Sequence, residues 1–112
     1  VTGTRELPRE SWIEFFDNVS TRHLNRRANL ECLGVAGAQT EAPELPLDGV
    51  SADHGGKRIT ITLGPRDVGV EHIIEKPSHV RIEEIGGADQ ALQIEAGGET
   101  TLLSFRAALP RK

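Results

Sequence analysis

Residues 57–63, with the sequence KRITITL, decide the fold class of this chain. Apolar side chains alternate there with polar or basic ones, and this period of two is typical of a strand that buries one face. The turn-forming sequence Asp53-His54-Gly55-Gly56 precedes the stretch, and Gly64-Pro65 ends it. We therefore predict a half-buried β-strand whose apolar face consists of Ile59, Ile61 and Leu63.

The residues that follow repeat this rhythm of short strand and glycine turn. Strands are predicted over 79–85, 91–96 and 100–106, separated by Gly86-Gly87 and Gly97-Gly98. Close spacing of such turns favours an antiparallel meander. Residues 69–75 fit either one helical turn or a short strand, and the helical turn is the favoured interpretation.

The residues before the strand contain one long helical pattern. Pro8 suits the first turn of a helix, and apolar side chains then recur at helical spacing, with Trp12, Phe16 and Val19 on one face. Three of the four aromatic residues lie in this segment, so the helix must pack on another element. Between the helix and the strand, we predict a strand over 28–35, a loop over 36–44 and an irregular edge strand over 45–50.

Together these elements predict an α+β fold. An N-terminal amphipathic helix packs on a five- to six-stranded antiparallel sheet, which is either open or partly closed into a barrel. A chain of 112 residues has room for one core. We expect a flexible arm over 1–7, a single globular domain over 8–106 and a C-terminal tail over 107–112.

Composition narrows the class of protein. Hydrophobic residues make up 37% and charged residues 27%, which is ordinary for a globular domain. Cys32 is the one cysteine, so an intrachain disulfide and a cysteine-based zinc finger are excluded. No apolar run approaches the roughly 20 residues of a membrane span, and no signal-peptide pattern is present. A soluble, cytoplasmic protein is the expectation.

The distribution of charge argues against nucleic acid as a partner. The formal net charge is −4, but residues 31–99 hold thirteen acidic and five basic side chains, a local net charge of −8. Such a segment repels phosphate backbones. The helix is mixed in charge and begins acidic, which also disfavours a membrane surface. We therefore expect no nucleic-acid partner and no membrane partner. The expected partner is another protein, or a second copy of this chain joined through an edge strand.

Titratable residues gather in two segments that interrupt the strand rhythm. Asp53 and His54 lie in the predicted turn, His72 lies in the ambiguous segment, and His79 begins a strand. Imidazole and carboxylate ligands would suit zinc or iron, but the spacing matches no ligand template, so no metal and no cofactor are expected. The same residues would offer acid–base chemistry if they converged.

Nucleophilic catalysis has weaker support. Cys32 falls on the apolar face of a predicted strand, where a cysteine usually acts as a small buried hydrophobe. No serine lies in a G-x-S-x-G motif, and no phosphate-binding glycine loop is present.

Three stretches carry a resemblance to a known family. They are RELPRESWIEFFDNVS (5–20), LPLDGVSAD (45–53) and VEHIIEKPSHVRIEE (70–84). With them the chain resembles the domain-of-unknown-function 5335 family of small bacterial proteins. The resemblance implies a compact bacterial cytoplasmic protein and supplies no activity, cofactor or catalytic residue.

The favoured function is a non-catalytic module that binds a protein or a small ligand. The alternative is a small enzyme with acid–base chemistry at His72 and Asp53 or His54. In either case the predicted binding residues are Asp53, His54, His72 and His79.

Overall fold

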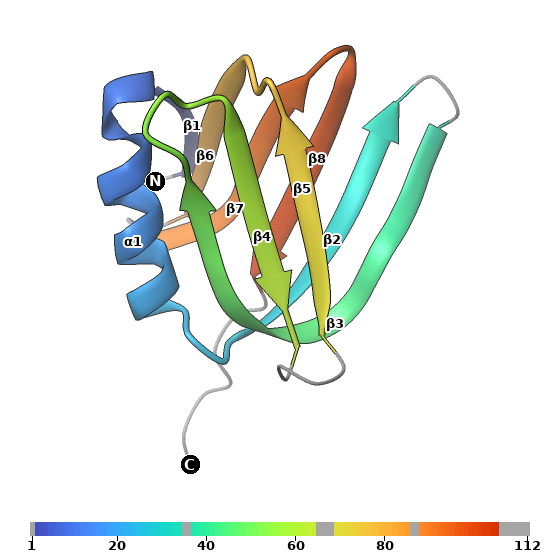
Figure 1. Cartoon of the computed structure of the whole chain (residues 1–112). Coiled ribbons are helices and arrows are strands. Elements are labelled where there is room, and N and C mark those ends of the chain that lie inside the picture. The colour runs from blue at the N-terminus through green and yellow to red at the C-terminus, as the bar shows by residue number, and fades with distance from the viewer. Residues whose placement is uncertain (1, 35–36, 65–68, 86–87, 106–112) are drawn as a thin grey trace.

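A computed structural model describes residues 2–34, 37–64, 69–85 and 88–105 (Figure 1). After strand β1 (Thr2–Leu7), a short 3₁₀ turn (Arg9–Ser11) leads into helix α1 (Trp12–Arg22). The remaining strands are β2 (Arg27–Gly34), β3 (Gly37–Ala52), β4 (Arg58–Leu63), β5 (Val70–Glu75), β6 (His79–Ile85), β7 (Ala88–Ala96) and β8 (Glu99–Phe105). The described part of the chain is therefore mostly sheet with one short helix.

All eight strands belong to one antiparallel sheet with the order β1-β6-β7-β8-β2-β3-β4-β5. Strand β3 joins the two parts of this sheet. Its first part pairs with β2 as far as Pro46, and its last part pairs with β4 from Leu47 onward. In Figure 1, β3 bends between these parts and carries β4 and β5 across the face of β7 and β8. The sheet thus curls over itself without closing.

Helix α1 lies beside the last part of β3, where β2 no longer pairs (Figure 1). The Ser20 hydroxyl oxygen is 2.9 Å from both the amide nitrogen and the carbonyl oxygen of Val50. It accepts a hydrogen bond from this amide. Because β2 no longer pairs with β3 at Val50, the helix side chain supplies the acceptor that a neighbouring strand would otherwise provide. The helix therefore covers one side of the curled sheet.

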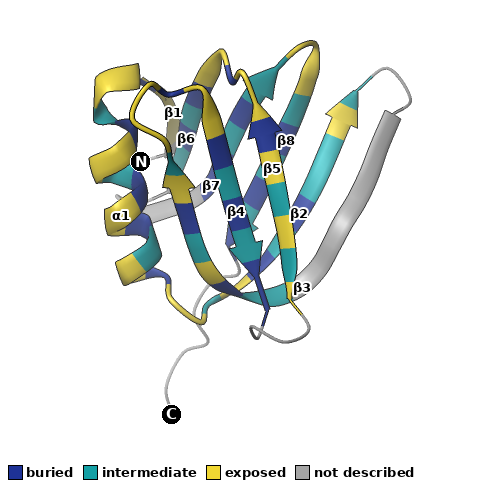
Figure 2. Cartoon of the chain, in the orientation of Figure 1, coloured by how far each residue is buried: buried dark blue, intermediate teal, exposed yellow. Residues whose placement is uncertain are grey.

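The core lies between α1 and the concave face of the sheet. Trp12, Phe16 and Val19 are buried at helical spacing, as the sequence predicts. Along the strands of the core, buried residues alternate with residues that are mostly only partly buried (Figure 2). The fully buried members include Leu30, Ile59, Ile61, Leu63, Val80, Ile82, Leu92, Ile94 and Leu103. The α+β class, the antiparallel pairing and the β6-β7-β8 meander are confirmed.

Several details of the expected fold are wrong. The sheet has eight described strands instead of five or six; of the two expected forms it has the open one, since it is not closed into a barrel. Residues 70–75 form strand β5 and not a helical turn, because Val70, His72 and Ile74 alternate toward the interior and all six residues pair with β4. The adjacent Ile73, which made helical spacing plausible, is 45% exposed on the outer face.

The segments expected to be irregular also differ. The arm over 1–7 includes strand β1, which pairs with β6 along its whole length. Residues 37–44, expected in a loop, belong to β3, and β3 is an inner strand of the sheet and not an edge. The tail over 107–112 lies outside the described residues.

Candidate functional site

The turn between β3 and β4 holds two of the predicted site residues, Asp53 and His54. One carboxylate oxygen of Asp53 accepts hydrogen bonds from the backbone amides of Lys57, at 2.7 Å, and Arg58, at 3.2 Å. Asp53 therefore closes the turn, which is a common structural use of aspartate. His54 is exposed in the same turn.

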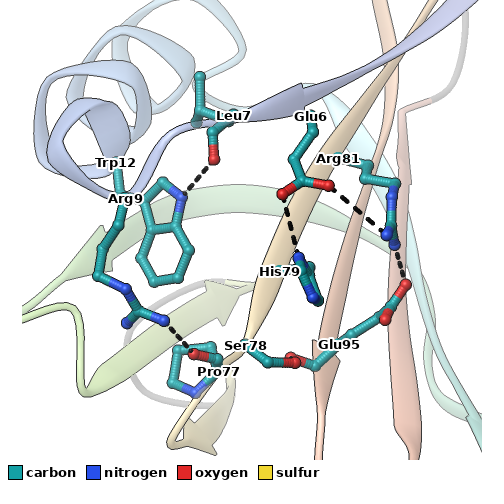
Figure 3. Close-up of polar contacts among 9 residues, drawn as sticks. All are labelled: Glu6, Leu7, Arg9, Trp12, Pro77, Ser78, His79, Arg81 and Glu95. Carbon is teal, nitrogen blue, oxygen red and sulfur yellow. Dashed lines mark hydrogen bonds and ion pairs between the residues drawn. The ribbon is translucent and has the colours of Figure 1, made fainter.

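Arg9 ties this turn to the start of the helix. Its guanidinium lies 4.4 Å from the centre of the Trp12 ring and donates a hydrogen bond of 3.0 Å to the carbonyl oxygen of Pro77 (Figure 3). It also donates a hydrogen bond to the carbonyl oxygen of Gly56. An added Cβ at Gly56 would lie 2.9 Å from the Arg9 side chain. The contacts of the turn thus account for its sequence without a ligand.

His79 lies at the beginning of β6, on the outer face of the sheet. Its Nδ1 is 3.1 Å from a carboxylate oxygen of Glu6 on β1, and Arg81 bridges Glu6 and Glu95 (Figure 3). These side chains are between 30% and 53% exposed, and such surface pairs contribute about 0–1 kcal/mol each. The cluster joins edge strand β1 to β6 and β7.

His72 lies in a different environment, on the inner face of edge strand β5. Its Nε2 is 3.7 Å from the Cys32 sulfur on β2, a distance at which a thiol can donate a hydrogen bond. The same sulfur is 3.8 Å from the Thr101 hydroxyl on β8. Cys32 and Thr101 are paired residues of neighbouring strands, whereas β3 and β4 separate β2 from β5 in the sheet. The curl of the sheet brings His72 to the other two.

These three side chains line a cavity of about 350 Å³. Glu75, Glu99 and Ala96 are also in its wall, together with Ile73 and Ile74. Its volume is at the lower end of the range found for small-molecule sites, about 300–1,000 Å³. Because β5 is the last of the described strands in the sheet order, no other strand that the structure describes pairs with its free edge. We call this cavity, lined by Cys32, His72 and Thr101, the Cys–His cleft.

Two glutamates border the Cys–His cleft, from different faces of the sheet: Glu75 alternates with Ile73 on the outer face of β5, whereas Glu99 begins β8. Glu75 forms an ion pair of 2.9 Å with Arg58, whereas Glu99 forms no ion pair with any residue that the structure describes. The Glu99 side chain lies against Gly34, where an added Cβ would be 3.1 Å from its Cγ. The absence of a side chain at Gly34 leaves room for Glu99 across the end of β2.

The structure does not bring the four predicted residues together. Glu75 of β5 pairs with Arg58, the first residue of β4, and the turn that holds Asp53 lies just before Arg58. His72 is three residues from Glu75 along β5, which at about 3.3 Å per residue places it roughly 10 Å from the end of the strand nearest this turn. Within the described ranges, Cys32 is the polar side-chain partner of His72. A second cavity, of about 510 Å³, contains Asp53 and Glu75 in its wall but not His72.

Sequence reasoning identified His72 but missed Cys32 and Thr101. The available signal was a polar residue at an inward position of each strand: Cys32 continues the inward alternation of Ala28 and Leu30, and Thr101 precedes Leu103. Thr101 is only 5% exposed, and burial of a hydroxyl requires a polar partner. Cys32 and Thr101 share one site because β2 pairs with β8, and the sequence of either strand alone does not show this pairing.

Neither a metal cluster nor a membrane-spanning helix is found in the described residues. No three of their histidine, cysteine, aspartate or glutamate side chains are arranged to hold a metal ion. No helix in this part of the chain is both long and apolar enough to cross a membrane.

The family model for the family of unknown function DUF5335 matches residues 3–112. The chain belongs to this family. An uncharacterized protein from Aquifex aeolicus (strain VF5) is 26% identical to this DUF5335 member over 110 residues, which cover 96% of each chain. No solved structure matches the DUF5335 member described here. The resemblance drawn from the sequence is confirmed, and neither match names an activity.

Proposed function

We propose that this DUF5335 protein is a non-catalytic module that binds a small ligand in the Cys–His cleft. The observation that carries the proposal is the cavity of about 350 Å³ that holds Cys32, His72 and Thr101 on the open side of the sheet. A concave site at which a few polar groups converge beside apolar residues is the usual form of a small-molecule pocket, and here Ile73, Ile74 and Ala96 supply the apolar part.

The contrast with the rest of the interior supports a ligand over a packing defect. Elsewhere on the concave face, apolar residues such as Leu30, Ile61 and Ile94 have no exposed surface. In the Cys–His cleft the inward positions of three strands instead hold a thiol, an imidazole and a hydroxyl. Inward polar groups weaken a core unless they gain partners, and a ligand supplies such partners.

Acid–base catalysis at His72 with Asp53 or His54 has less support. The Asp53 carboxylate already accepts two backbone hydrogen bonds in its turn. A general base requires hydrogen-bonding reach to its partner or to the substrate, and the wall of the Cys–His cleft contains neither Asp53 nor His54. We therefore favour binding over this reaction.

Two experiments test the proposal. Native mass spectrometry of protein purified from its own host reports a retained ligand and its stoichiometry. In parallel, a fragment set of small amines, imidazoles, carboxylic acids and neutral amides is added to ¹⁵N-labelled protein. Binding should shift the amide signals of Cys32, His72 and Thr101 together.

Matched histidine variants locate the binding. His72→Gln removes the imidazole from the Cys–His cleft, whereas His54→Gln makes the same change in the exposed turn. We expect fragment affinity to fall in the first variant and to stay unchanged in the second. No fragment shifts, or equal losses in both variants, would contradict a ligand site in this cleft.

A further inference from the structure

We propose that Cys32 is a thiol–disulfide exchange site that forms a mixed disulfide with a small cationic aminothiol. The inference rests on the proposed function, because the ligand would enter the same Cys–His cleft. It adds a covalent step and a charge preference to that binding site.

The first argument is the imidazole beside the thiol. The thiolate, not the thiol, is the nucleophile in disulfide exchange. His72 Nε2, 3.7 Å from the Cys32 sulfur, is placed to take the thiol proton and to stabilise the thiolate as an ion pair. The pairing of a cysteine with a neighbouring base is the usual way in which proteins activate this nucleophile.

The second argument is access to the sulfur. Cys32 is only partly buried, and its sulfur lies in the wall of a cavity on the open side of the sheet. Because the chain has no other cysteine, no internal thiol can resolve a disulfide that forms there. The stable product with a small disulfide is therefore a mixed disulfide.

The third argument is charge. Glu75 borders the Cys–His cleft from the outer face of β5 and is paired with Arg58, so Glu99 is the carboxylate that sets the charge of the cleft. The local charge is therefore negative, which attracts a cation and repels an anion. Among small disulfides, the cleft should select those that carry ammonium groups.

The exchange step balances without another oxidant. The Cys32 proton passes to Nε2 of His72, and the thiolate attacks one sulfur of the small disulfide. A new S–S bond forms as the original one breaks, and the leaving thiolate takes the proton from the imidazolium to depart as a free aminothiol. The added disulfide is reduced by one thiol equivalent, and Cys32 is oxidised. An excess of free thiol reverses the reaction.

The test compares two small disulfides of opposite charge. Cystamine carries two ammonium groups, and dithiodipropionate carries two carboxylates. The rate of mass increase of the intact protein is measured with each reagent at pH 7 and low salt. Each rate is divided by the rate of a free cysteine peptide with the same reagent, which removes intrinsic differences between the two disulfides.

We expect the normalised rate to be about tenfold higher for cystamine than for dithiodipropionate, as unit charges a few ångströms apart imply. High salt should reduce the ratio. Glu99→Gln should lower it to about one, because the remaining Glu75 is paired with Arg58, whereas Glu14→Gln, the same change on the exposed face of α1, should leave it unchanged. Equal normalised rates for both reagents would overturn the cationic preference.

His72→Gln should slow both reagents about tenfold, because the thiolate loses its partner, and His54→Gln should slow neither. If His72→Gln keeps the wild-type rates, His72 does not activate the thiol and the exchange proposal fails. Cys32→Ser separates this failure from that of the proposed function. Fragments that still bind this variant support the binding site even where exchange is absent; absence of both binding and exchange refutes both proposals.

Discussion

Replacement of Trp12 by alanine tests whether the helix belongs to the core. Trp12 is 2% exposed, and its indole N–H donates a hydrogen bond of 3.0 Å to the carbonyl oxygen of Leu7. A buried tryptophan removes about 200 Å² from water, and at about 25 cal/mol per Å² this is worth at most about 5 kcal/mol. We expect Trp12→Ala to lower the free energy of unfolding by about 3–5 kcal/mol.

Two further variants separate the contributions at this position. Trp12→Phe keeps most of the apolar surface but leaves the Leu7 carbonyl without its donor, so it should cost about 1–2 kcal/mol. Ile13→Ala changes the neighbouring helix residue, which is 37% exposed, and should cost about 0.5 kcal/mol. The expected order of destabilisation is therefore Trp12→Ala, Trp12→Phe and Ile13→Ala.

Urea denaturation followed by far-UV circular dichroism measures these differences. Tryptophan fluorescence is unsuitable, since Trp12 is the one tryptophan of the chain. A loss below about 1 kcal/mol for Trp12→Ala would place the helix outside the core. Equal losses for Trp12→Ala and Trp12→Phe would show that the hydrogen bond, and not the buried surface, dominates.

Four more outcomes can be checked on the same protein. Ser20→Ala should cost about 1–2 kcal/mol in urea denaturation, because it leaves a β3 amide without its acceptor. Gly56→Ala should destabilise more than Gly97→Ala; both glycines have positive φ, but only Gly56 has Arg9 within 3 Å of the added Cβ, and thermal melts of the pair give the difference. Gel-shift assays at physiological salt should show no binding to duplex DNA or single-stranded RNA, and micromolar, salt-sensitive binding would contradict the charge argument. Elemental analysis of untagged protein should find well under one equivalent of zinc or iron, and a stoichiometric metal lost in His72→Ala would contradict this.

Helix α1 and strand β4 could be predicted because the spacing of their apolar residues along the sequence shows which face is buried. Trp12, Phe16 and Val19 recur at helical spacing, and Ile59 and Ile61 alternate along a strand. Both patterns report contact with a core, whatever the partner element is. The sequence therefore indicates which faces are buried, and the class of fold follows.

Strand β1 could not be predicted in this way. Its residues from Gly3 to Glu6 are all exposed, and only Leu7 enters the core. The strand is held through backbone pairing with β6 and surface ion pairs such as Arg5–Glu84. Backbone hydrogen bonds leave no hydrophobic pattern in the sequence, so an edge strand of this kind looks like an irregular segment.

The candidate site was only partly predictable for a different reason. His72 is visible as a histidine in an unusual segment, but its contact with Cys32 spans 40 positions of the chain. That contact requires the bend in β3 that turns β5 back over the sheet, and the place of Thr101 beside Cys32 requires the β2–β8 pairing. Neither feature is encoded in the residues near His72 or Cys32.

Different elements line the two sides of the curled sheet, and this difference explains where the Cys–His cleft lies. On one side, α1 supplies two fully buried aromatic rings, and Ser20 satisfies the backbone of β3. On the other side, β5 is the last strand, and inward positions of β5, β2 and β8 hold polar side chains. Large aromatic side chains fill space well, whereas a thiol, an imidazole and a hydroxyl leave the cavity of about 350 Å³. If the open side were only an incompletely sealed core, replacing Cys32 by valine should stabilise the fold, because it adds apolar volume. Because a functional cleft also allows this gain in stability, the rate of exchange decides between the two cases. A functional cleft predicts that wild-type Cys32 exchanges with cystamine faster than the free cysteine peptide does, and an incompletely sealed core predicts that it does not.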